Sequence, residues 1–341
     1  DLLRSRGLGD VYKRQGMLAP GTLFEELGFN YIGPMDGHNL NEMLATLRNL
    51  KDLKGPKLLH LITQKGKGFE PAEKNPIGFH ALNKIETSNS KTNGKKYSAV
   101  FGDWLIEKVE NGDKNLVAIT PAMSEGSGMN EFSTKYPDQF FDVAIAEQHS
   151  MTFAAGLAKE GKKPILAIYS TFLQRAYDQL IHDVSLQKLD VTLAIDRAGF
   201  VGGDGATHAG IFDVSFLRCI PNMIIMSPSD ENECWKMLST GYDYNGPAAI
   251  RYPRGEGPGT DIVSNFENLK IGEAKILRDV SSDIVIFSFG NMLELSKEIA
   301  DELGCSLVDM RFIKPLDENL IRRFASNCKH IISLSLIHIS E

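Results

Sequence analysis

The sequence predicts an α/β protein built on a doubly wound parallel sheet, and two observations support this fold class. Short apolar runs of strand length alternate with amphipathic helical segments over most of the chain. Polar and Gly-rich residues follow directly after several of these runs, which is typical of sites beyond the carboxyl ends of parallel strands. With 341 residues, the chain has room for roughly two domains of ordinary size.

The composition narrows the class of protein. Hydrophobic residues make up 42% of the chain and charged residues 24%, as in globular proteins with sizeable cores. The formal net charge of −7 argues against nucleic acid as a partner. The four cysteines are too scattered for a zinc site, and no apolar run approaches membrane-spanning length. We therefore expect a cytoplasmic protein with reduced thiols and with no nucleic acid or membrane partner.

The first part of the chain predicts an incomplete domain. Residues 1–15, and the tail at 334–341, lack clear periodicity and are expected to be a non-native-looking extension and tail. Residues 16–81 predict one βαβ unit, which is too short to be a whole nucleotide-binding sheet, so we expect the C-terminal remnant of a larger domain. Its helix places apolar residues on one face: Leu40, Met43, Leu44, Leu47 and Leu50. Residues 82–96 are polar and rich in Gly, Ser, Asn and Lys, which predicts a linker.

Residues 97–255 predict a full α/β domain. Strands are expected at 115–120, 140–146, 163–170, 190–196, 222–227 and 247–252, with helices at 98–110 and 172–187. Residues 256–333 start the same architecture again and then stop, so we expect a truncated α/β domain. Its strands are expected at 282–290 and 306–312 and its helices at 291–303 and 317–325.

Glu147 lies at a predicted junction between a strand and a helix. The apolar residues from Phe141 to Ala146 predict a buried strand, and small and apolar residues recur at helical spacing from His149. An acid at such a junction is partly desolvated and is a candidate proton-transfer group. The alternative is an acid at a helix N-terminus that is stabilised by the helix dipole and has no further role.

The sequence Gly203-Asp204-Gly205, followed later by Asn232, resembles a signature that holds a magnesium diphosphate. We reject this interpretation on two grounds. The aspartate is not followed by a helix that begins on the diphosphate, and Asn232 lies within a segment where Ser229 and Asp230 predict a helix N-cap. We therefore expect no metal ligand in this chain.

The same Gly-rich loop is better suited to a small polar substrate. Asp204 and His208 could hydrogen-bond hydroxyl or carbonyl groups and move protons. Arg197 and Arg254 offer planar cationic groups suited to a phosphate or a carboxylate, although each could equally form a structural salt bridge. Arg251 has a weaker claim and is expected to be a structural neighbour. Tyr169 and Phe172, at a predicted strand end, could stack on a flat ring or pack in the core.

Six segments carrying these residues closely resemble the 1-deoxy-D-xylulose-5-phosphate synthase family of transketolase-like thiamine diphosphate enzymes. They are residues 66–80, 141–149, 168–184, 194–213, 227–233 and 250–255, and the resemblance covers about 17–333. The combination of DRAG, DGATHAG and YPRG is specific to this family, whereas EQH alone would also suit transketolases and the β subunits of 2-oxo acid dehydrogenases. The resemblance implies a transketolase-like fold and the condensation of pyruvate with glyceraldehyde 3-phosphate, with release of carbon dioxide.

The resemblance also implies roles for single residues. Glu147 matches the carboxyl that hydrogen-bonds the aminopyrimidine ring of thiamine diphosphate, and Phe172 and Tyr169 match residues lining the pyrimidine pocket. The remaining matches concern the substrates and the catalytic steps. Arg197 and Arg254 match a clamp for the acceptor phosphate, Asp204 and His208 match residues at the acceptor or intermediate, and His80 matches an active-site histidine.

The chain departs from the family in its first domain, most of which is not represented. That domain carries the ligands for the diphosphate and Mg²⁺, so we expect this chain alone to bind the cofactor weakly and to be inactive. A homodimer is the expectation for the full-length enzyme. Two alternatives stay open: one subunit of a split transketolase or 2-oxo acid dehydrogenase E1 β-like enzyme, and a non-catalytic binding module that kept the fold.

Overall fold

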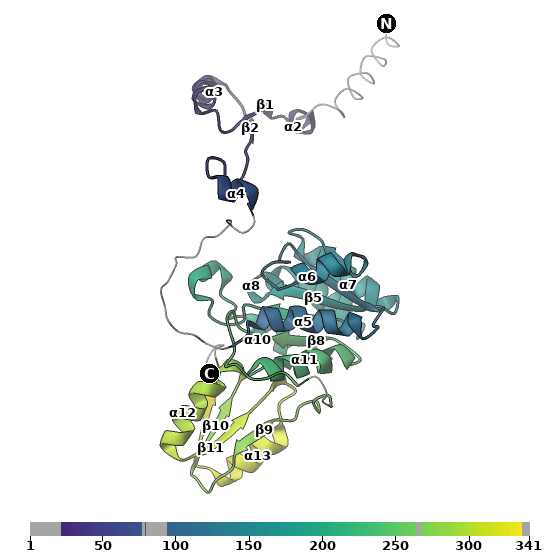
Figure 1. Cartoon of the computed structure of the whole chain (residues 1–341), viewed down its shortest axis with the longest axis vertical. Helices are drawn as coiled ribbons and strands as arrows, with labels where there is room; N and C mark the ends of the chain where they lie inside the picture. The colour runs from purple at the N-terminus through teal and green to yellow at the C-terminus, as the bar shows by residue number, and fades with distance from the viewer. Residues whose placement is uncertain (1–21, 77–78, 80–93, 264–266, 336–341) are drawn as a thin grey trace. The chain divides into compact units, whose positions relative to one another are not determined.

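The computed structural model describes residues 22–76, 79, 94–263 and 267–335 (Figure 1). By its internal contacts the chain divides into two compact units, 1–88 and 89–341. Three segments with a predicted role lie wholly or largely outside the described residues: 1–15, most of the 82–96 linker, and 336–341 at the tail. His80 also lies outside them.

The first unit is a small βαβ element, as the sequence predicts. Its elements are α2 (Thr22–Glu26), β1 (Asn30–Asp36), α3 (Leu40–Asp52), β2 (Lys57–Ile62) and α4 (Glu70–Lys74). Strands β1 and β2 pair in parallel, and Asn39 caps α3 by accepting a hydrogen bond from the backbone N–H of Glu42 at 3.2 Å. The apolar face of α3 is not buried within the described residues, and Leu40 is 59% exposed.

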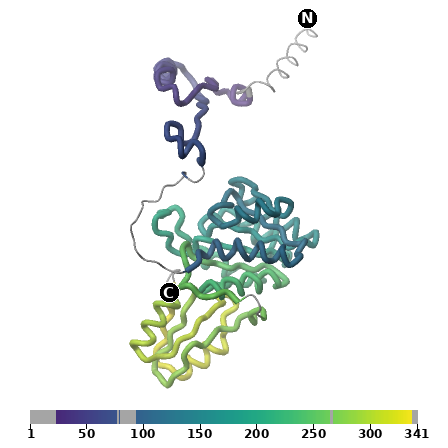
Figure 2. The backbone as a smooth tube through the Cα atoms, viewed as in Figure 1, coloured from purple at the N-terminus to yellow at the C-terminus, as the bar shows by residue number. Residues whose placement is uncertain are grey.

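The second unit is built on a seven-stranded sheet, traced in Figure 2. Its strands are β3 (Leu116–Thr120), β4 (Phe140–Asp142), β5 (Lys163–Tyr169), β6 (Thr192–Asp196), β7 (Ile224–Met226), β8 (Ala248–Arg251) and β12 (Phe312–Lys314). Their order is β12-β7-β8-β6-β5-β3-β4, and every pairing is parallel except that of β12 with β7. The predicted doubly wound parallel sheet is therefore confirmed.

Helices cover both faces of this sheet because its strands are apolar on both sides. One core joins the sheet to α5 (Tyr97–Glu110), α6 (Asn130–Lys135) and α11 (Glu231–Asp243), of which α5 and α11 run side by side in Figure 1. The other core joins it to α7 (Glu147–Lys159), α8 (Ser170–Leu173), α9 (Tyr177–Gln179) and α10 (Asp213–Arg218). Alternate strand residues, such as Leu193 and Ala194, enter opposite cores.

Two predicted elements differ in the structure. The strand predicted over 140–146 is present only over 140–142, and its predicted burial is wrong: β4 ends at Asp142 at the edge of the described sheet, and Ile145 is 79% exposed. The carboxylate of Asp142 accepts hydrogen bonds from the backbone N–H groups of Ala122 and Ala144, each at 2.9 Å, and so turns the chain out of the sheet. The helix predicted over 172–187 is broken into α8, the 3₁₀ turn η2 (Gln174–Ala176), α9 and the π-helical turn η3 (Leu180–Ser185).

The C-terminal part adds a second sheet with the order β13-β10-β11-β9. Its elements are β9 (Lys275–Arg278), β10 (Ile284–Ser288), α12 (Leu293–Leu303), β11 (Ser306–Asp309), α13 (Glu318–Asn327) and β13 (His330–Leu334). Helices α12 and α13 pack on opposite faces, as Figure 1 shows. Strand β12, which follows β11 in the sequence, pairs with β7 of the larger sheet instead of joining this one. The chain therefore passes directly from one sheet into the other between β11 and β12.

One buried carboxylate ties both ends of the larger α/β region together. Glu231 is 1% exposed and accepts hydrogen bonds from the backbone N–H groups of Lys95 at 3.1 Å, Gly259 at 2.9 Å and Thr260 at 3.1 Å. A Cβ atom at Gly257 would lie 2.4 Å from the carboxyl carbon of Glu231, so the backbone at Gly257 packs directly against this carboxylate. One side chain, that of Glu231, therefore holds together the segments that precede and follow this region.

Replacing this carboxylate by an amide tests that role. We expect Glu231→Gln to lower the free energy of unfolding by about 1–3 kcal/mol, because buried N–H donors lose an acceptor. The measurement is urea unfolding followed by the fluorescence of Trp104 and Trp235, both buried in this region. Glu131→Gln, at an exposed i,i+4 pair with Lys135, is the matched control and should change the free energy by less than about 0.5 kcal/mol. Equal effects of the two changes would contradict the role of Glu231.

Candidate functional site

The register of two central strands brings the first site residues together. Tyr169 at the end of β5 and Asp196 at the end of β6 are paired positions in the sheet. The next residue, Arg197, has φ of 56°, in the left-handed region that non-glycine residues seldom occupy. A strained backbone at a strand end is typical of a functional position, and here it places the Arg197 side chain beside Tyr169.

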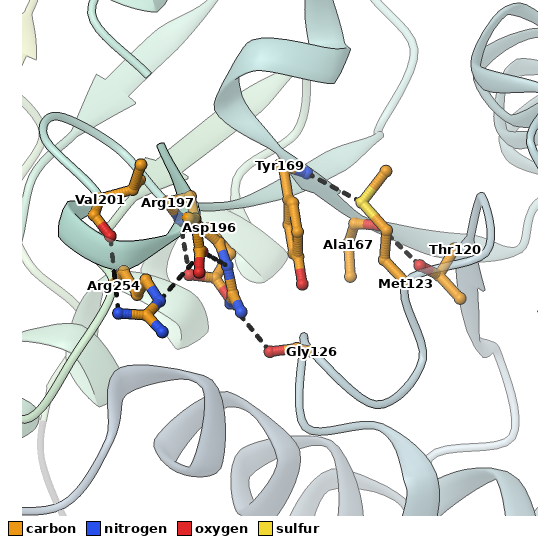
Figure 3. Close-up of polar contacts among 10 residues, drawn as sticks. Thr120, Met123, Gly126, Ala167, Tyr169, Asp196, Arg197, Val201 and Arg254 are labelled. Atoms are coloured by element: carbon orange, nitrogen blue, oxygen red, sulfur yellow. Dashed lines mark hydrogen bonds and ion pairs between the residues drawn. The ribbon is translucent and has the colours of Figure 1, made fainter. Parts of the chain in front are cut away.

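Arg197 is the centre of a polar cluster (Figure 3). Its Nη1 donates hydrogen bonds to Oδ2 of Asp196 at 2.5 Å and to the carbonyl oxygen of Gly126 at 3.0 Å. Its guanidinium carbon lies 4.1 Å from the centre of the Tyr169 ring, as a cation–π contact. Burial raises the pKa of Asp196 to about 6 although Arg197 opposes the rise, and burial raises the pKa of Tyr169 to about 12.

Asp204 joins a second arginine to this cluster. Its Oδ2 lies 2.9 Å from Nε of Arg254 and 3.6 Å from Nε of Arg197. Arg254 also donates to the carbonyl oxygen of Val201 at 3.5 Å. The 3₁₀ turns η4 (Gly202–Asp204) and η5 (Ala206–His208) carry Asp204 and His208 on one loop. Two guanidinium groups and two carboxyls, those of Asp196 and Asp204, therefore meet at the rim where β6 ends. The guanidinium groups are of the kind that binds anionic substrates.

Aromatic rings connect this cluster to the loop histidine. Tyr169 and Phe172 stack with ring centres 5.9 Å apart and planes inclined by 17°. The edge contact of Phe172 with His208 has a centre distance of 5.4 Å. Nδ1 of His208 lies 3.0 Å from Oγ1 of Thr207. These ring contacts therefore connect the end of β5 to the loop that carries His208.

Glu147 is connected to the same aromatic rings through Arg175. It is the first residue of α7 and is only 2% exposed, which confirms the desolvated acid that the sequence predicts. Its Oε1 accepts a hydrogen bond from Nη1 of Arg175 at 2.5 Å. The guanidinium carbon of Arg175 lies 5.0 Å from the centre of the Phe172 ring. The carboxyl is thus buried beside an aromatic face and paired with a half-exposed cation.

Every described residue that the sequence assigned to the site belongs to this connected set of contacts. Its members are Glu147, Tyr169, Phe172, Arg197, Asp204, His208 and Arg254. Arg251 is a structural neighbour, as expected, because its Nε donates to Asp213 at 2.9 Å and both side chains are buried.

The two residues of the rejected magnesium signature have other partners in the structure. The Asp204 carboxylate is paired with arginines, and Oδ1 of Asn232 accepts a hydrogen bond from the backbone N–H of Val263 at 3.0 Å. Asp230 caps α11, as predicted. Within the described ranges there is no group of three or more His, Cys, Asp or Glu side chains that could hold a metal ion.

Sequence reasoning missed three residues of the site. Arg175 was assigned to a regular helix, and only its position within an otherwise apolar segment near Tyr169 signalled a special role. Asp196 directly precedes Arg197, and an acid at the end of an apolar strand is a signal of the kind used for Glu147. Gly126 accepts from Arg197, and a Cβ there would lie 1.7 Å from the Tyr169 hydroxyl, so only glycine leaves room for that ring.

Three family models match the chain. The model described as "Transketolase, pyrimidine binding domain" matches residues 94–260, "1-deoxy-D-xylulose-5-phosphate synthase" matches 9–63, and "Transketolase, C-terminal domain" matches 272–335. The curated 1-deoxy-D-xylulose-5-phosphate synthase of Marinomonas sp. is 60% identical over 311 residues, covering 90% of this chain and 50% of that protein. Over most of its length the chain is closely similar to members of the 1-deoxy-D-xylulose-5-phosphate synthase family.

Further members of this family show the same relation. The synthase of Vibrio campbellii is 58% identical over 325 residues, covering 94% of this chain and 52% of that protein. The synthase of Pseudomonas putida strain F1 is 57% identical over 343 residues, covering 98% of this chain and 54% of that protein. The chain thus spans about half the length of the curated relatives it matches.

Solved structures agree with the fold of this family. A structure entitled "Split gene transketolase, inactive beta4 tetramer" has a TM-score of 0.62 and 26% identity, covering 70% of this chain and 79% of that chain. A transketolase from Campylobacter jejuni has a TM-score of 0.61 and 17% identity, covering 92% of this chain and 64% of that chain. In the part of the chain that the structure describes, no helix has the length and apolar character needed to cross a bilayer.

A double-mutant cycle tests whether Glu147 and Arg175 form a true pair. Arg175→Met leaves a buried carboxylate without its cation, whereas Arg175→Met with Glu147→Gln removes both charges. We expect a coupling of about 1–2 kcal/mol in the free energy of unfolding, measured by urea titration at pH 8. The exposed pair Glu131 and Lys135, changed to Gln and Met, is the control and should give less than about 0.5 kcal/mol. A coupling no larger than the control would show that the buried pair is absent in solution.

Proposed function

We propose that this chain carries the pyrimidine-binding half of a 1-deoxy-D-xylulose-5-phosphate synthase site. The whole protein would be a transferase that condenses pyruvate with glyceraldehyde 3-phosphate and releases carbon dioxide, feeding isoprenoid, thiamine and pyridoxal precursors. The observation that carries this proposal is the buried carboxyl of Glu147 in one connected cluster with Phe172, Tyr169 and three arginines. The similarity to these synthases supports the choice of substrates.

The described residues fit thiamine diphosphate on its pyrimidine side. When bound, this cofactor supplies the carbon nucleophile that the side chains of the protein lack. The carboxyl of Glu147 is nearly excluded from water, as a group that holds or shares a proton with a ring nitrogen should be. Phe172 and Tyr169 offer ring faces for a flat heterocycle. Arg175 donates a hydrogen bond to the Glu147 carboxyl, and it would have to move away before a ring nitrogen could bind there.

The acceptor side is proposed for the cluster at the end of β6. Arg197 and Arg254 would bind the phosphate of the aldehyde substrate, because two guanidinium groups meet there around one carboxylate. Asp204 and His208 would hydrogen-bond the hydroxyl and carbonyl groups of the acceptor and move protons at those oxygens. His80 is proposed for the same site on the resemblance alone.

Mg²⁺ has no fitting ligand group among the described residues. Because the chain spans about half the length of its relatives, we place the ligands of Mg²⁺ and the diphosphate in the part that corresponds to their remaining length. We further propose the domain limits 16–81, 97–255 and 256–333, which family models matching 94–260 and 272–335 support. The homodimer and the cytoplasmic location stay predictions.

A second candidate is one subunit of a split enzyme. The solved structure entitled "Split gene transketolase, inactive beta4 tetramer" favours it, because this chain covers 79% of that protein. The match of residues 9–63 to the synthase model and the 60% identity to a synthase of about twice the length count in favour of the first candidate. In the first candidate the diphosphate-binding part belongs to the same polypeptide as this chain. In the second candidate it is a separate subunit.

Complementation tests the proposal. The chain is joined to the N-terminal half of the Marinomonas synthase and expressed in a bacterium lacking its own synthase. We expect the hybrid to restore growth and Glu147→Gln to lower product formation at least about 100-fold, because acid–base catalysis typically contributes that much or more. Glu160→Gln, a change at the exposed C-cap residue of the same helix, should keep activity.

Each outcome has a distinct meaning. The chain expressed alone should not restore growth, and growth from two separately expressed halves would favour the split enzyme. Full activity of Glu147→Gln would overturn the proposed role of Glu147. A hybrid that folds and binds thiamine diphosphate but forms no 1-deoxy-D-xylulose 5-phosphate would overturn the proposed reaction.

A further inference from the structure

A second buried polar cluster lies where the two sheets of the larger unit meet. Asp309, at the end of β11, is 1% exposed, and its Oδ2 accepts a hydrogen bond from Oγ of Ser229 at 2.8 Å. Its Oδ1 accepts from the backbone N–H of Arg311 at 3.1 Å. Ser229 directly precedes Asp230, the N-cap of α11, so this contact joins the C-terminal sheet to a helix of the larger one.

Arg311 makes the second connection of this cluster. Its Nη2 donates to Oε1 of Glu233 at 2.8 Å, and Glu233 is 2% exposed. Its carbonyl oxygen accepts from the backbone N–H of Ser227 at 2.9 Å, just beyond β7. The φ of Arg311 is 52°, in the left-handed region, so the chain is strained where it passes from β11 to β12.

The cluster holds more acid than base. Two buried carboxyls, those of Glu233 and Asp309, share the single guanidinium of Arg311. Lys275 of β9, the strand partner of Asp309, acts electrostatically on the neighbouring Asp230. Nε of Arg311 and Oε2 of Glu233 are buried and have no hydrogen-bond partner among the described residues. A fully charged cluster is therefore poorly compensated, whereas one bound proton would remove the excess negative charge.

We propose that this cluster is a proton-controlled latch, which holds the C-terminal sheet firmly against the larger sheet when Asp309 is protonated and loosens when Asp309 is ionised. The latch does not depend on the proposed function, because its residues lie outside the candidate site. The latch joins two parts of this chain, the C-terminal sheet and the larger sheet, and the ligand that controls it is the proton.

The direction of the pH effect follows from the burial of Asp309. Burial raises the pKa of Asp309 from 3.8 to about 6, and the negative charge of Glu233 adds to the rise, while Ser229 and Arg311 oppose it. The closed junction thus binds the proton more tightly than the open one. The stabilisation is complete below the ordinary pKa of 3.8 and is lost as the pH rises through about 6. Because each pKa unit corresponds to about a factor of ten, opening should increase about tenfold to a hundredfold between pH 4.5 and pH 7.5.

Hydrogen exchange on the full chain measures this opening. The reporters are peptides containing Ser227 and β12, whose backbone hydrogen bonds cross the junction, and a peptide from β5 is the internal reference. Protection factors, corrected for the intrinsic exchange rate at each pH, should fall about tenfold or more from pH 4.5 to pH 7.5 at the junction and remain constant in β5.

Three variants decide between a latch and an unspecific pH effect. Asp309→Asn mimics the protonated acid and should abolish the pH dependence. Asp317→Asn changes an N-cap aspartate of α13 in the same C-terminal part, where asparagine can also cap, and should leave the pH dependence unchanged. Ser229→Ala removes a hydrogen bond that lowers the pKa of Asp309, so the midpoint of the transition should move to higher pH.

The proposal is overturned if junction protection in the unmodified chain is constant between pH 4.5 and pH 7.5. It is equally overturned if Asp309→Asn retains the fall. Should Asp309→Asn not fold, Ser229→Ala decides, and an unchanged or lowered midpoint would contradict the latch.

Discussion

The parallel register of the central strands is the constraint on which the candidate site depends. Tyr169 and Asp196 are paired positions at the ends of β5 and β6, so sheet pairing alone brings an aromatic ring and the Asp196–Arg197 turn together. Helix α7 then places Glu147 on the same side through Arg175. A shift of one residue in this register would send Tyr169 to the opposite face of the sheet and separate the ring from the arginine.

Charge balance distinguishes the site from the junction between the sheets. At the site, three arginines face three buried or half-buried carboxyls, and each carboxyl has a cationic partner. At the junction, by contrast, the two buried carboxyls of Glu233 and Asp309 share the single guanidinium of Arg311. Both clusters use an arginine in the left-handed region, which shows that strain alone does not identify a binding site.

Much of the fold could be predicted because buried parallel strands are short apolar runs that a sequence displays directly. The predicted strand over 140–146 was wrong beyond Asp142, where Ile145 continues an apolar pattern into an exposed turn held by the Asp142 carboxylate. The pairing of β12 with β7 was not predicted, since an antiparallel contact between residues so far apart leaves no local pattern. Among the site residues, Arg175 was missed because a helical pattern does not show which acid a cation will meet. His80 was predicted but lies outside the described residues.

The proposed function requires that the buried carboxyl of Glu147 receives the pyrimidine ring of thiamine diphosphate. A crystal structure of the hybrid protein with bound thiamine diphosphate tests it most directly. We expect a ring nitrogen within about 3.2 Å of the Glu147 carboxyl, the ring against Phe172, and Arg175 moved away from its present partner. A bound cofactor whose ring lies elsewhere, with Glu147 still paired to Arg175, would contradict the account.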